Sequence, residues 1–258
     1  MEITVLVENT CDNECCGTEH GLSMFIRTQK YNILFDMGQT TLFLENAKKL
    51  GVDLASVDFA VLSHGHYDHG GGLDAFLKIN KKALVYVNEN VFGGFYNAED
   101  RYIGLDKSLK NHPRIVQVAE SLVIEKGIMM VSCNNKKKKY DFGSFGLKKE
   151  VEACLIADDF CHEQYLCIAE HGKKVVFSGC AHRGVLNIMD WLKPDIFVGG
   201  FHISKIKDKV ALDHLAHALN SYNADYYTCH CTGQEQYLYM KQHMPRLFYL
   251  SSGKKIII

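Results

Sequence analysis

Proline and tryptophan are scarce in this sequence of 258 residues, which contains 3 prolines and 1 tryptophan. No stretch rich in proline and serine interrupts the chain. Linkers between domains often have such a composition, so the sequence predicts one domain over residues 1–258. The hydrophobic fraction of 47% is enough for one substantial core.

The sequence also lacks an excess of either charge, because its 29 Lys and Arg residues are balanced by 30 Asp and Glu residues. A strong basic excess is typical of proteins that attract nucleic acids or acidic membranes. We therefore expect a small-molecule substrate, and neither a nucleic acid nor a membrane as partner. The one basic run, Lys136 to Lys139, indicates an exposed loop or hairpin tip, or else a contact for an anion. The oligomeric state stays open.

The sequence has no apolar run long enough to span a membrane, and no basic segment and cleavable apolar stretch at its start. We therefore expect a cytoplasmic protein. In that compartment its 10 cysteines would be reduced thiols, metal ligands or redox groups, and a disulfide framework is excluded.

Short apolar or alternating segments between turn residues predict strands, and longer segments with helical spacing predict helices. The predicted strands are 3–8, 22–27, 31–36, 58–63, 83–87, 151–157, 165–169, 174–178, 195–199, 224–229 and 246–250, and the predicted helices are 41–50, 73–78, 184–193, 209–221 and 233–243. Within 83–150, beyond the first strand, we expect loops that flank the active site. Strands interleaved with helices indicate a layered α/β fold.

Four potential metal ligands stand within six residues, at His64, His66, Asp68 and His69. They follow an apolar strand and precede Gly70-Gly71-Gly72, which permits a tight turn. In extended backbone the first two histidines point to the same side, and the following turn can bring the other two donors to a neighbouring point. The spacing therefore predicts a loop that serves two metal ions.

A single loop leaves each ion short of ligands, so further donors are expected at later strand ends. His182 and His230 each follow an apolar strand, and we expect them to complete the two sites. His202 follows another such strand, and we expect it to face the substrate or to support a ligand. Cys180 either coordinates a metal through a thiolate or lies unbound beside the site.

These residues resemble the metallo-β-lactamase superfamily, whose HxHxDH signature matches residues 64–69. Further motifs resemble the branch named after 7,8-dihydropterin-6-methyl-4-(β-D-ribofuranosyl)aminobenzene-5′-phosphate synthase. They occur in that branch's order at residues 19–23, 36–39, 63–73, 158–159, 163–164, 179–184, 199–202 and 230–233.

The resemblance implies a four-layer αββα sandwich with a dinuclear metal centre at one edge. It implies that His64, His66 and His182 surround one ion, that Asp68, His69 and His230 surround the other, and that Asp36 supports the loop. The cofactors would be two divalent metal ions, zinc first, with iron or manganese as alternatives. The chain departs from the superfamily at Cys180, where many members have a bridging aspartate, and from the branch at Ala181, which replaces a serine.

As an enzyme, such a centre would polarise an ester, phosphate or carbonyl oxygen and lower the pKa of a bound water to about 7. Asp68 could accept a proton during attack, and His202, Glu163 and His20 are candidates for orienting substrate or protonating a leaving group. Arg183 could pair with a phosphate or carboxylate, or be a surface arginine.

Three functions remain open: hydrolysis of a small ester, lactone or phosphoester, a transferase reaction like that of the named synthase, and a metal- or redox-sensing role without catalysis. The last is suggested by Cys11, Cys15 and Cys16, which could otherwise be plain reduced thiols. Cys229 and Cys231 alternate with His230, so we expect both to face away from its metal.

Overall fold

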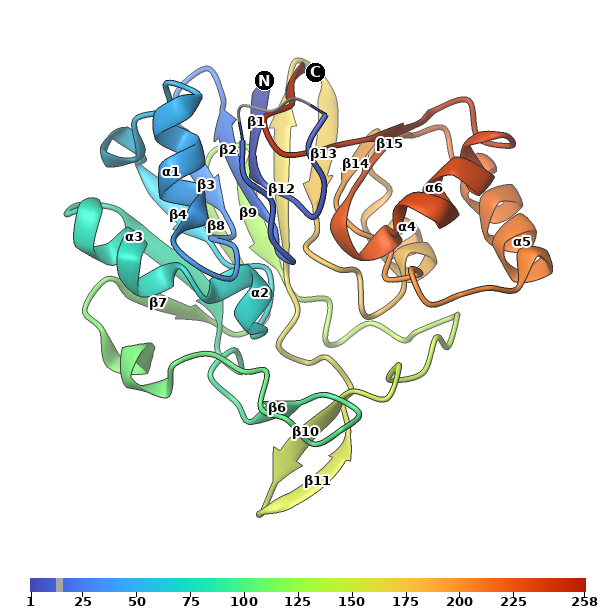
Figure 1. The fold of residues 1–258 in the computed structure, drawn as a ribbon, viewed down its shortest axis with the longest axis horizontal. Helices are drawn as coiled ribbons and strands as arrows, with labels where there is room; N and C mark the ends of the chain where they lie inside the picture. The colour runs from blue at the N-terminus through green and yellow to red at the C-terminus, as the bar shows by residue number, and fades with distance from the viewer. Residues whose placement is uncertain (13–15) are drawn as a thin grey trace.

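The computed structural model describes residues 1–12 and 16–258. Two seven-stranded sheets face each other with helices on their outer sides (Figure 1). The first sheet has the order β17-β1-β2-β3-β4-β5-β7 and the second the order β16-β15-β14-β13-β12-β9-β8.

The strand bounds of the first sheet are β1 (Glu2–Val7), β2 (Ser23–Arg27), β3 (Asn32–Phe35), β4 (Phe59–Val61), β5 (Leu84–Asn88), β7 (Ile115–Val118) and β17 (Lys255–Ile257). Those of the second are β8 (Ser121–Glu125), β9 (Ile128–Val131), β12 (Tyr165–Glu170), β13 (Lys173–Phe177), β14 (Ile196–Val198), β15 (Asp225–Thr228) and β16 (Leu247–Tyr249). The helices are α1 (Leu42–Lys49), α2 (Tyr67–Gly70), α3 (Leu73–Ile79), α4 (Val185–Leu192), α5 (Lys209–Asn220) and α6 (Gln234–Lys241), with 3-10 turns η1 (Leu54–Ser56), η2 (Lys107–Asn111) and η3 (His230–Thr232).

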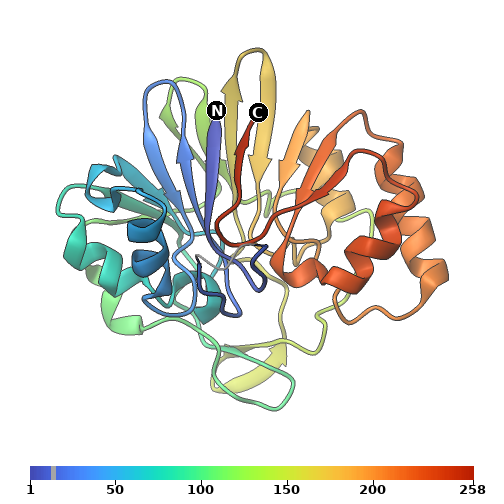
Figure 2. The ribbon, with the colours of Figure 1, turned by 45° about the horizontal axis from the view of Figure 1, so that its top comes forward.

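Alternation along the strands produces four layers. In β12, Leu166 belongs to the core between the sheets and Tyr165 to the core under the outer helices. In β1, Val5 likewise packs between the sheets and Leu6 packs toward α1 and α3. Figure 2 shows the two sheets in the middle, with α1 and α3 on one side and α4, α5 and α6 on the other. The predicted αββα sandwich is confirmed.

Parallel pairing brings the carboxyl ends of several strands to one edge of the molecule. Strands β3, β4 and β5 are parallel neighbours in the first sheet, and β13, β14 and β15 are parallel neighbours in the second. Side chains that follow these strands therefore come together although they are far apart in sequence.

The predicted strand 151–157 is interrupted, because its residues belong to two strands of a hairpin. Strands β10 (Lys148–Val151) and β11 (Cys154–Ala157) pair antiparallel and join β6 (Phe95–Tyr96) in a third, small sheet that projects from the body (Figure 1). The chain reverses at Glu152 and Ala153, which both have positive φ. Residues 83–150 also contain β7, β8 and β9, so the loops expected there are partly strands of the main sheets.

The other predicted helices and strands occur within a few residues of their expected bounds. Most of the Lys136 to Lys139 run is exposed in a loop. None of the helices in the described part of the chain is long and apolar enough to cross a lipid bilayer.

Candidate metal centre

The 64–69 segment begins directly after β4 and lies at the shared sheet edge. His66 has extended backbone, with φ −96° and ψ 146°, and precedes the single-turn helix α2. Asp68 and His69 therefore lie one turn further on, as the sequence predicts. His64, His66, Asp68 and His69 are all buried.

Asp36 anchors this segment from behind. Its Oδ1 accepts the Ser63 backbone N–H at 2.7 Å, and its Oδ2 accepts the Ser63 hydroxyl at 2.7 Å. The same Oδ2 lies 2.7 Å from His69 Nδ1. A carboxylate accepts hydrogen bonds, so His69 carries its proton on Nδ1 and its Nε2 lone pair is free.

Ser63 orients His64 in the same way. Because the Ser63 hydroxyl donates to Asp36, its oxygen accepts from His64 Nδ1, 2.8 Å away. The His64 Nε2 lone pair is thus directed to the opposite side. Gly179 makes this arrangement possible, since a Cβ there would lie 2.2 Å from Ser63 Oγ.

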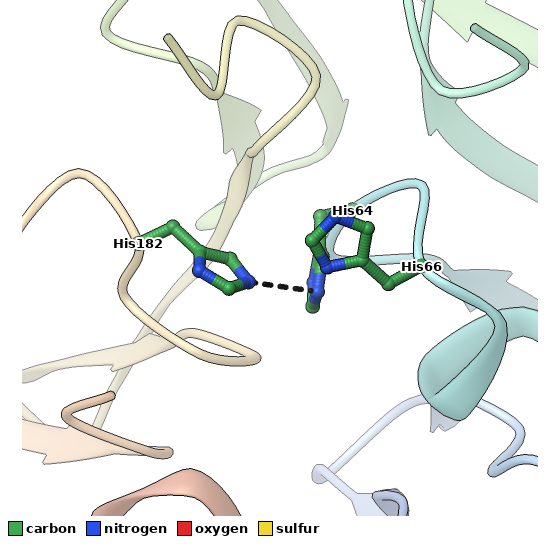
Figure 3. Close-up of side chains that lie close together, drawn as sticks. All are labelled: His64, His66 and His182. Carbon is green, nitrogen blue, oxygen red and sulfur yellow. Dashed lines mark hydrogen bonds between the residues drawn. The ribbon is translucent and has the colours of Figure 1, made fainter. Parts of the chain in front are cut away.

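His182 approaches from the second half of the chain. Figure 3 shows its ring facing His64 and His66, and its Nε2 lies 3.3 Å from His64 Nε2. Glu163 holds the turn before α4 by accepting the backbone N–H groups of His182 at 2.8 Å and Arg183 at 3.0 Å.

A second pair of imidazoles meets beside the first. His230 Nδ1 lies 2.7 Å from Asn9 Oδ1, and an amide oxygen only accepts, so the Nε2 lone pair of His230 is also free. This Nε2 lies 3.2 Å from His69 Nε2 and 3.3 Å from Asp68 Oδ2. Two nitrogen lone pairs therefore face each other at a distance that suits two ligands of one cation, or a single N–H···N hydrogen bond when His230 takes up a second proton.

The spacing of these donors fits a metal ion. Two nitrogens bound to one tetrahedral zinc at about 2.0–2.1 Å lie about 3.3 Å apart. The Nε2 atom of His66 is buried without a hydrogen-bond partner in the described part of the chain. Donor atoms within 4.8 Å of one another form several groups, among them His64/His66/His182, His64/His69/Cys180, Cys180/His230/Cys231 and His20/Asp68/His230.

The protonation states of the buried groups suit ligands. Burial lowers the pKa of His66 to about 3 and, together with the neighbouring imidazoles, lowers the pKa of His64 and His182 well below the ordinary value. Burial alone would raise the pKa of Asp68, but the neighbouring His69, His20 and His230 imidazoles hold that pKa well below its usual range, and Asp68 in turn raises the pKa of His230 against the effect of burial. Neutral imidazoles and an ionised carboxylate are the forms that bind metals.

Cys180 lies in the middle of the cluster, with its Sγ 3.2 Å from His69 Nε2. The expectation for Cys231 is wrong, whereas that for Cys229 holds. Cys229 is fully buried in the core between the sheets. Cys231 instead lines the same cavity as His230, because His230 has φ +51° and starts the 3-10 turn η3.

A cavity of about 440 Å³ opens onto this cluster. Asp68, His182 and His230 lie on its wall, as do the predicted residues His20 and His202. The rest of its lining includes Asn9, His66, Tyr67, Asn97, Ile103, Phe145, Leu147, Cys180, Ser204, Lys205, Ile206, Cys231 and Gly233.

His20 and His202 lie on the cavity wall near different ligands. His20 Nε2 lies 3.3 Å from Asp68 Oδ2, and the hydrogen bond to Asp68 raises the pKa of His20. The His202 ring lies 4.2 Å from the His182 ring, and its Nδ1 has no hydrogen-bond partner among the described residues.

Two predicted residues do not face the cavity. Glu163 is fully buried behind His182 and also accepts the Tyr165 hydroxyl at 2.9 Å, so it positions His182 and is not part of the cavity wall. Arg183 is neither at the surface nor aimed at an anion. Its guanidinium donates to the Ser132 carbonyl and to Asn134, and lies over the Trp191 ring.

Sequence reasoning missed His162 and Asn9. The Nδ1 atom of His162 accepts the Gly65 N–H at 3.0 Å, so its Nε2 carries the proton and donates to Asp158 at 3.1 Å. His162 therefore supports the loop and has no lone pair to offer a metal. Of the N-terminal cysteines, Cys15 lies outside the described residues, and the Cys11 thiol donates to the Ser252 carbonyl.

Comparison with known families agrees with this geometry. Residues 16–222 match the family model described as the metallo-beta-lactamase superfamily. The chain belongs to the metallo-beta-lactamase superfamily. This superfamily consists mostly of metal-dependent hydrolases, and its members generally bind divalent metals, typically zinc.

Within the superfamily, two curated proteins of Methanocaldococcus jannaschii are similar over nearly the whole chain. The uncharacterized protein MJ0448 is 28% identical over 90% of this chain and 90% of its own length. The 7,8-dihydropterin-6-methyl-4-(beta-D-ribofuranosyl)-aminobenzene-5'-phosphate synthase is 26% identical over 93% of this chain and 90% of its own length. Among solved structures, Tm1679, a metal-dependent hydrolase of the beta-lactamase superfamily, has a TM-score of 0.86 and 28% identity, and covers 100% of this chain and 99% of its own.

Proposed function

We propose that this chain is a metal-dependent hydrolase that acts on a small ester, lactone or phosphoester. The observation that carries the proposal is the pair of imidazoles His69 and His230. Their Nδ1–H groups donate hydrogen bonds to Asp36 and Asn9, so each Nε2 keeps its lone pair. The two Nε2 atoms lie 3.2 Å apart. That arrangement is stable when a cation lies between them.

The donors divide into two sets. His64, His66 and His182 would hold one divalent ion, and Asp68, His69 and His230, whose donor atoms lie 3.2–3.8 Å apart, would hold the other. Cys180 would contribute its thiolate between the two sets, since its Sγ belongs to donor groups with members of both. Nitrogen, oxygen and sulfur donors together favour zinc, with ferrous iron as an alternative.

Bound ions of this kind polarise a carbonyl or phosphoryl oxygen and make a bound water more acidic. The chain's own residues would then place substrate and protons. Asp68 is the proposed proton acceptor. Its Oδ2 lies 3.3 Å from His20 Nε2, so the two side chains share a proton at the cavity wall. His202 is the proposed proton donor to the leaving oxygen, because its side chain lines the cavity beside His182.

A substrate screen tests this proposal. Generic esters, lactones and phosphoesters should be hydrolysed by protein restored with zinc, iron or manganese. His66→Ala should abolish turnover together with metal binding, whereas His202→Ala should keep its metal and lower kcat by about 10²–10⁴-fold. His214→Ala, at an exposed position on α5, is the matched control. Turnover that survives removal of the metal would contradict the proposal.

A transferase reaction is the second candidate, because the M. jannaschii synthase covers nearly the whole chain. We propose it at the same site. Incubation with a dihydropterin and a ribofuranosyl aminobenzene phosphate, followed by mass spectrometry, should give the coupled product if this candidate is correct. If only hydrolysis products appear, the first candidate stands.

A further inference from the structure

The thiol of Cys231 lies against the candidate metal centre because the backbone turns sharply at the end of β15. Cys229 is extended, with φ −165° and ψ −176°, and His230 then takes a left-handed conformation with φ +51°. This break in the alternation directs Cys231 into the cavity together with His230, whereas Cys229 stays in the apolar core.

Contacts with the loop after β14 fix Cys231 in this position. Its carbonyl accepts the backbone N–H groups of Ile203 and Ser204, both at 3.1 Å. Its sulfur packs directly on Gly200, where an added Cβ would lie 2.3 Å from Sγ. The thiol is thus held in place before any ligand binds.

Other donors surround this sulfur. The Sγ atoms of Cys180 and Cys231 and a ring nitrogen of His230 all lie within 4.8 Å of one another, and all three residues are buried. Asp68 Oδ2 lies 3.3 Å from His230 Nε2 on the same side. Sulfur, nitrogen and oxygen are the kinds of donor that zinc sites use, and together with His69, whose Nε2 lies 3.2 Å from His230 Nε2, these residues offer the second ion five such donors.

We propose that Cys231 is a metal ligand and forms, with Cys180 and His230, a sulfur-rich site for a thiophilic divalent ion such as zinc or ferrous iron. The proposal rests on the metal centre proposed above and goes beyond it, because it gives the second ion two thiolate ligands. Thiolates bind zinc and ferrous iron more strongly than manganese or magnesium. The centre would therefore select against the harder ions at this position.

Cobalt substitution tests the proposal without measuring activity. Metal-free protein, kept anaerobic with a reductant, is titrated with Co²⁺, and sulfur-to-cobalt charge transfer is followed in the near ultraviolet. Wild-type protein should show this absorption, and Cys231→Ala should lower it by about half. Cys229→Ala is the matched control, because that cysteine stands two residues away but faces the core, and it should leave the absorption unchanged.

Cobalt-edge X-ray absorption on the wild-type protein gives a second readout that does not depend on how a variant folds. Since the two proposed ions share Cys180, an average of more than one sulfur neighbour per cobalt would support the proposal, and an average of one or none would overturn it. An unchanged absorption in Cys231→Ala would also overturn it. So would a disulfide between Cys180 and Cys231 that persists in the presence of the reductant, and neither result would contradict the metal centre itself. Failure of the wild-type protein to bind cobalt would instead contradict the proposed hydrolase.

Discussion

At the scale of single residues, hydrogen bonds behind the imidazoles decide which nitrogen is available to a metal. Asp36 accepts a hydrogen bond directly from His69 Nδ1. It orients His64 indirectly, because the Ser63 hydroxyl accepts from His64 Nδ1 and donates to Asp36. His162 shows the opposite case, because its Nδ1 accepts an N–H and its Nε2 is directed to Asp158. Position in the cluster alone does not make a histidine a ligand.

Replacing Asp36 with asparagine should weaken metal binding without removing a ligand. The amide has one oxygen and one NH₂ group, so it cannot accept the Ser63 backbone N–H on one side and the Ser63 hydroxyl and His69 N–H on the other, and the imidazoles lose their fixed orientation. Loss of such a supporting partner typically costs about 10–100-fold in metal affinity. A competition titration with a chelator measures the change, and Asp58→Asn, near the surface beside Lys82, is the control. Equal affinities in the two variants would contradict the role of Asp36.

The metal-free protein should become less stable as the pH falls. Burial lowers the pKa of His66 to about 3 from an ordinary value of 6.5, so below pH 6.5 the unfolded chain takes up a proton that the folded chain does not. The free energy of unfolding should fall by up to about 1.4 kcal/mol per pH unit for each such histidine, between about pH 6.5 and pH 3.

Urea unfolding of chelator-treated protein at pH 7.5 and 5.5 measures this dependence. His66→Asn should show a smaller loss than wild type, and His214→Asn the same loss as wild type. His230 shifts in the opposite direction, since its hydrogen bond to Asp68 raises its pKa against the effect of burial. The comparison between variants therefore carries the test, and identical slopes in wild type and His66→Asn would refute it.

The sequence singles out the candidate metal donors because their residue types are chemically distinctive and four of them are closely spaced. Of the residues that support them, it predicted Asp36 through the family resemblance, but not Asn9 or Ser63. Asn9 and Ser63 are common residue types, and the contact of Asn9 with His230 joins positions 221 apart in sequence. It offered Glu163 as a candidate for contacting substrate and Arg183 as a partner for an anion or a surface residue, whereas both side chains are buried and hydrogen-bonded within the protein around the turn before α4.

At the scale of secondary structure elements, the alternation of apolar and polar residues predicted the buried strands correctly but not the exposed hairpin of β10 and β11. Strand β11 is exposed along its whole length, so burial imposes no alternation on it. Glu152 and Ala153 form the hairpin turn without a glycine or asparagine to signal it. The predicted orientation of Cys231 was wrong for a similar reason. The left-handed backbone conformation of His230, which reverses the alternation, has no signal in the sequence.

Gly179 follows β13 and packs directly on Ser63 and His64, which follow β4. This contact leaves no room for a side chain at position 179. In Gly179→Ala the new Cβ would meet Ser63 Oγ at 2.2 Å and His64 Nδ1 at 3.0 Å. We expect a loss of about 1–3 kcal/mol in the free energy of unfolding, together with weaker metal binding. Urea unfolding and a metal titration measure the two effects.

Gly51→Ala is the control for that variant. No atom lies within 4 Å of a Cβ at Gly51, so only its positive φ of +70° opposes the change. It should lower stability by about 1 kcal/mol and leave metal affinity unchanged. Metal binding by Gly179→Ala as tight as that of Gly51→Ala would contradict the proposed packing at the sheet edge.

At the scale of the whole molecule, the candidate centre joins the two halves of the sandwich. The 64–69 segment follows a strand of the first sheet, and Cys180, His182 and His230 follow strands of the second. The chain ends also meet, since β17 pairs with β1 and the amino terminus donates to the Ile258 carbonyl at 2.8 Å. Bound metal would therefore tie both sheets together and stabilise the folded state by mass action.

Metal content is the most direct test of the central claim that donors from both halves of the chain grip a pair of cations. The protein should be purified without oxygen and without chelators, and its metals measured by elemental analysis. We predict about two divalent ions per chain, mainly zinc or iron, and a clear loss in a folded His66→Ala variant. Folded wild-type protein that holds no metal, even after incubation with zinc, iron or manganese, would contradict the account.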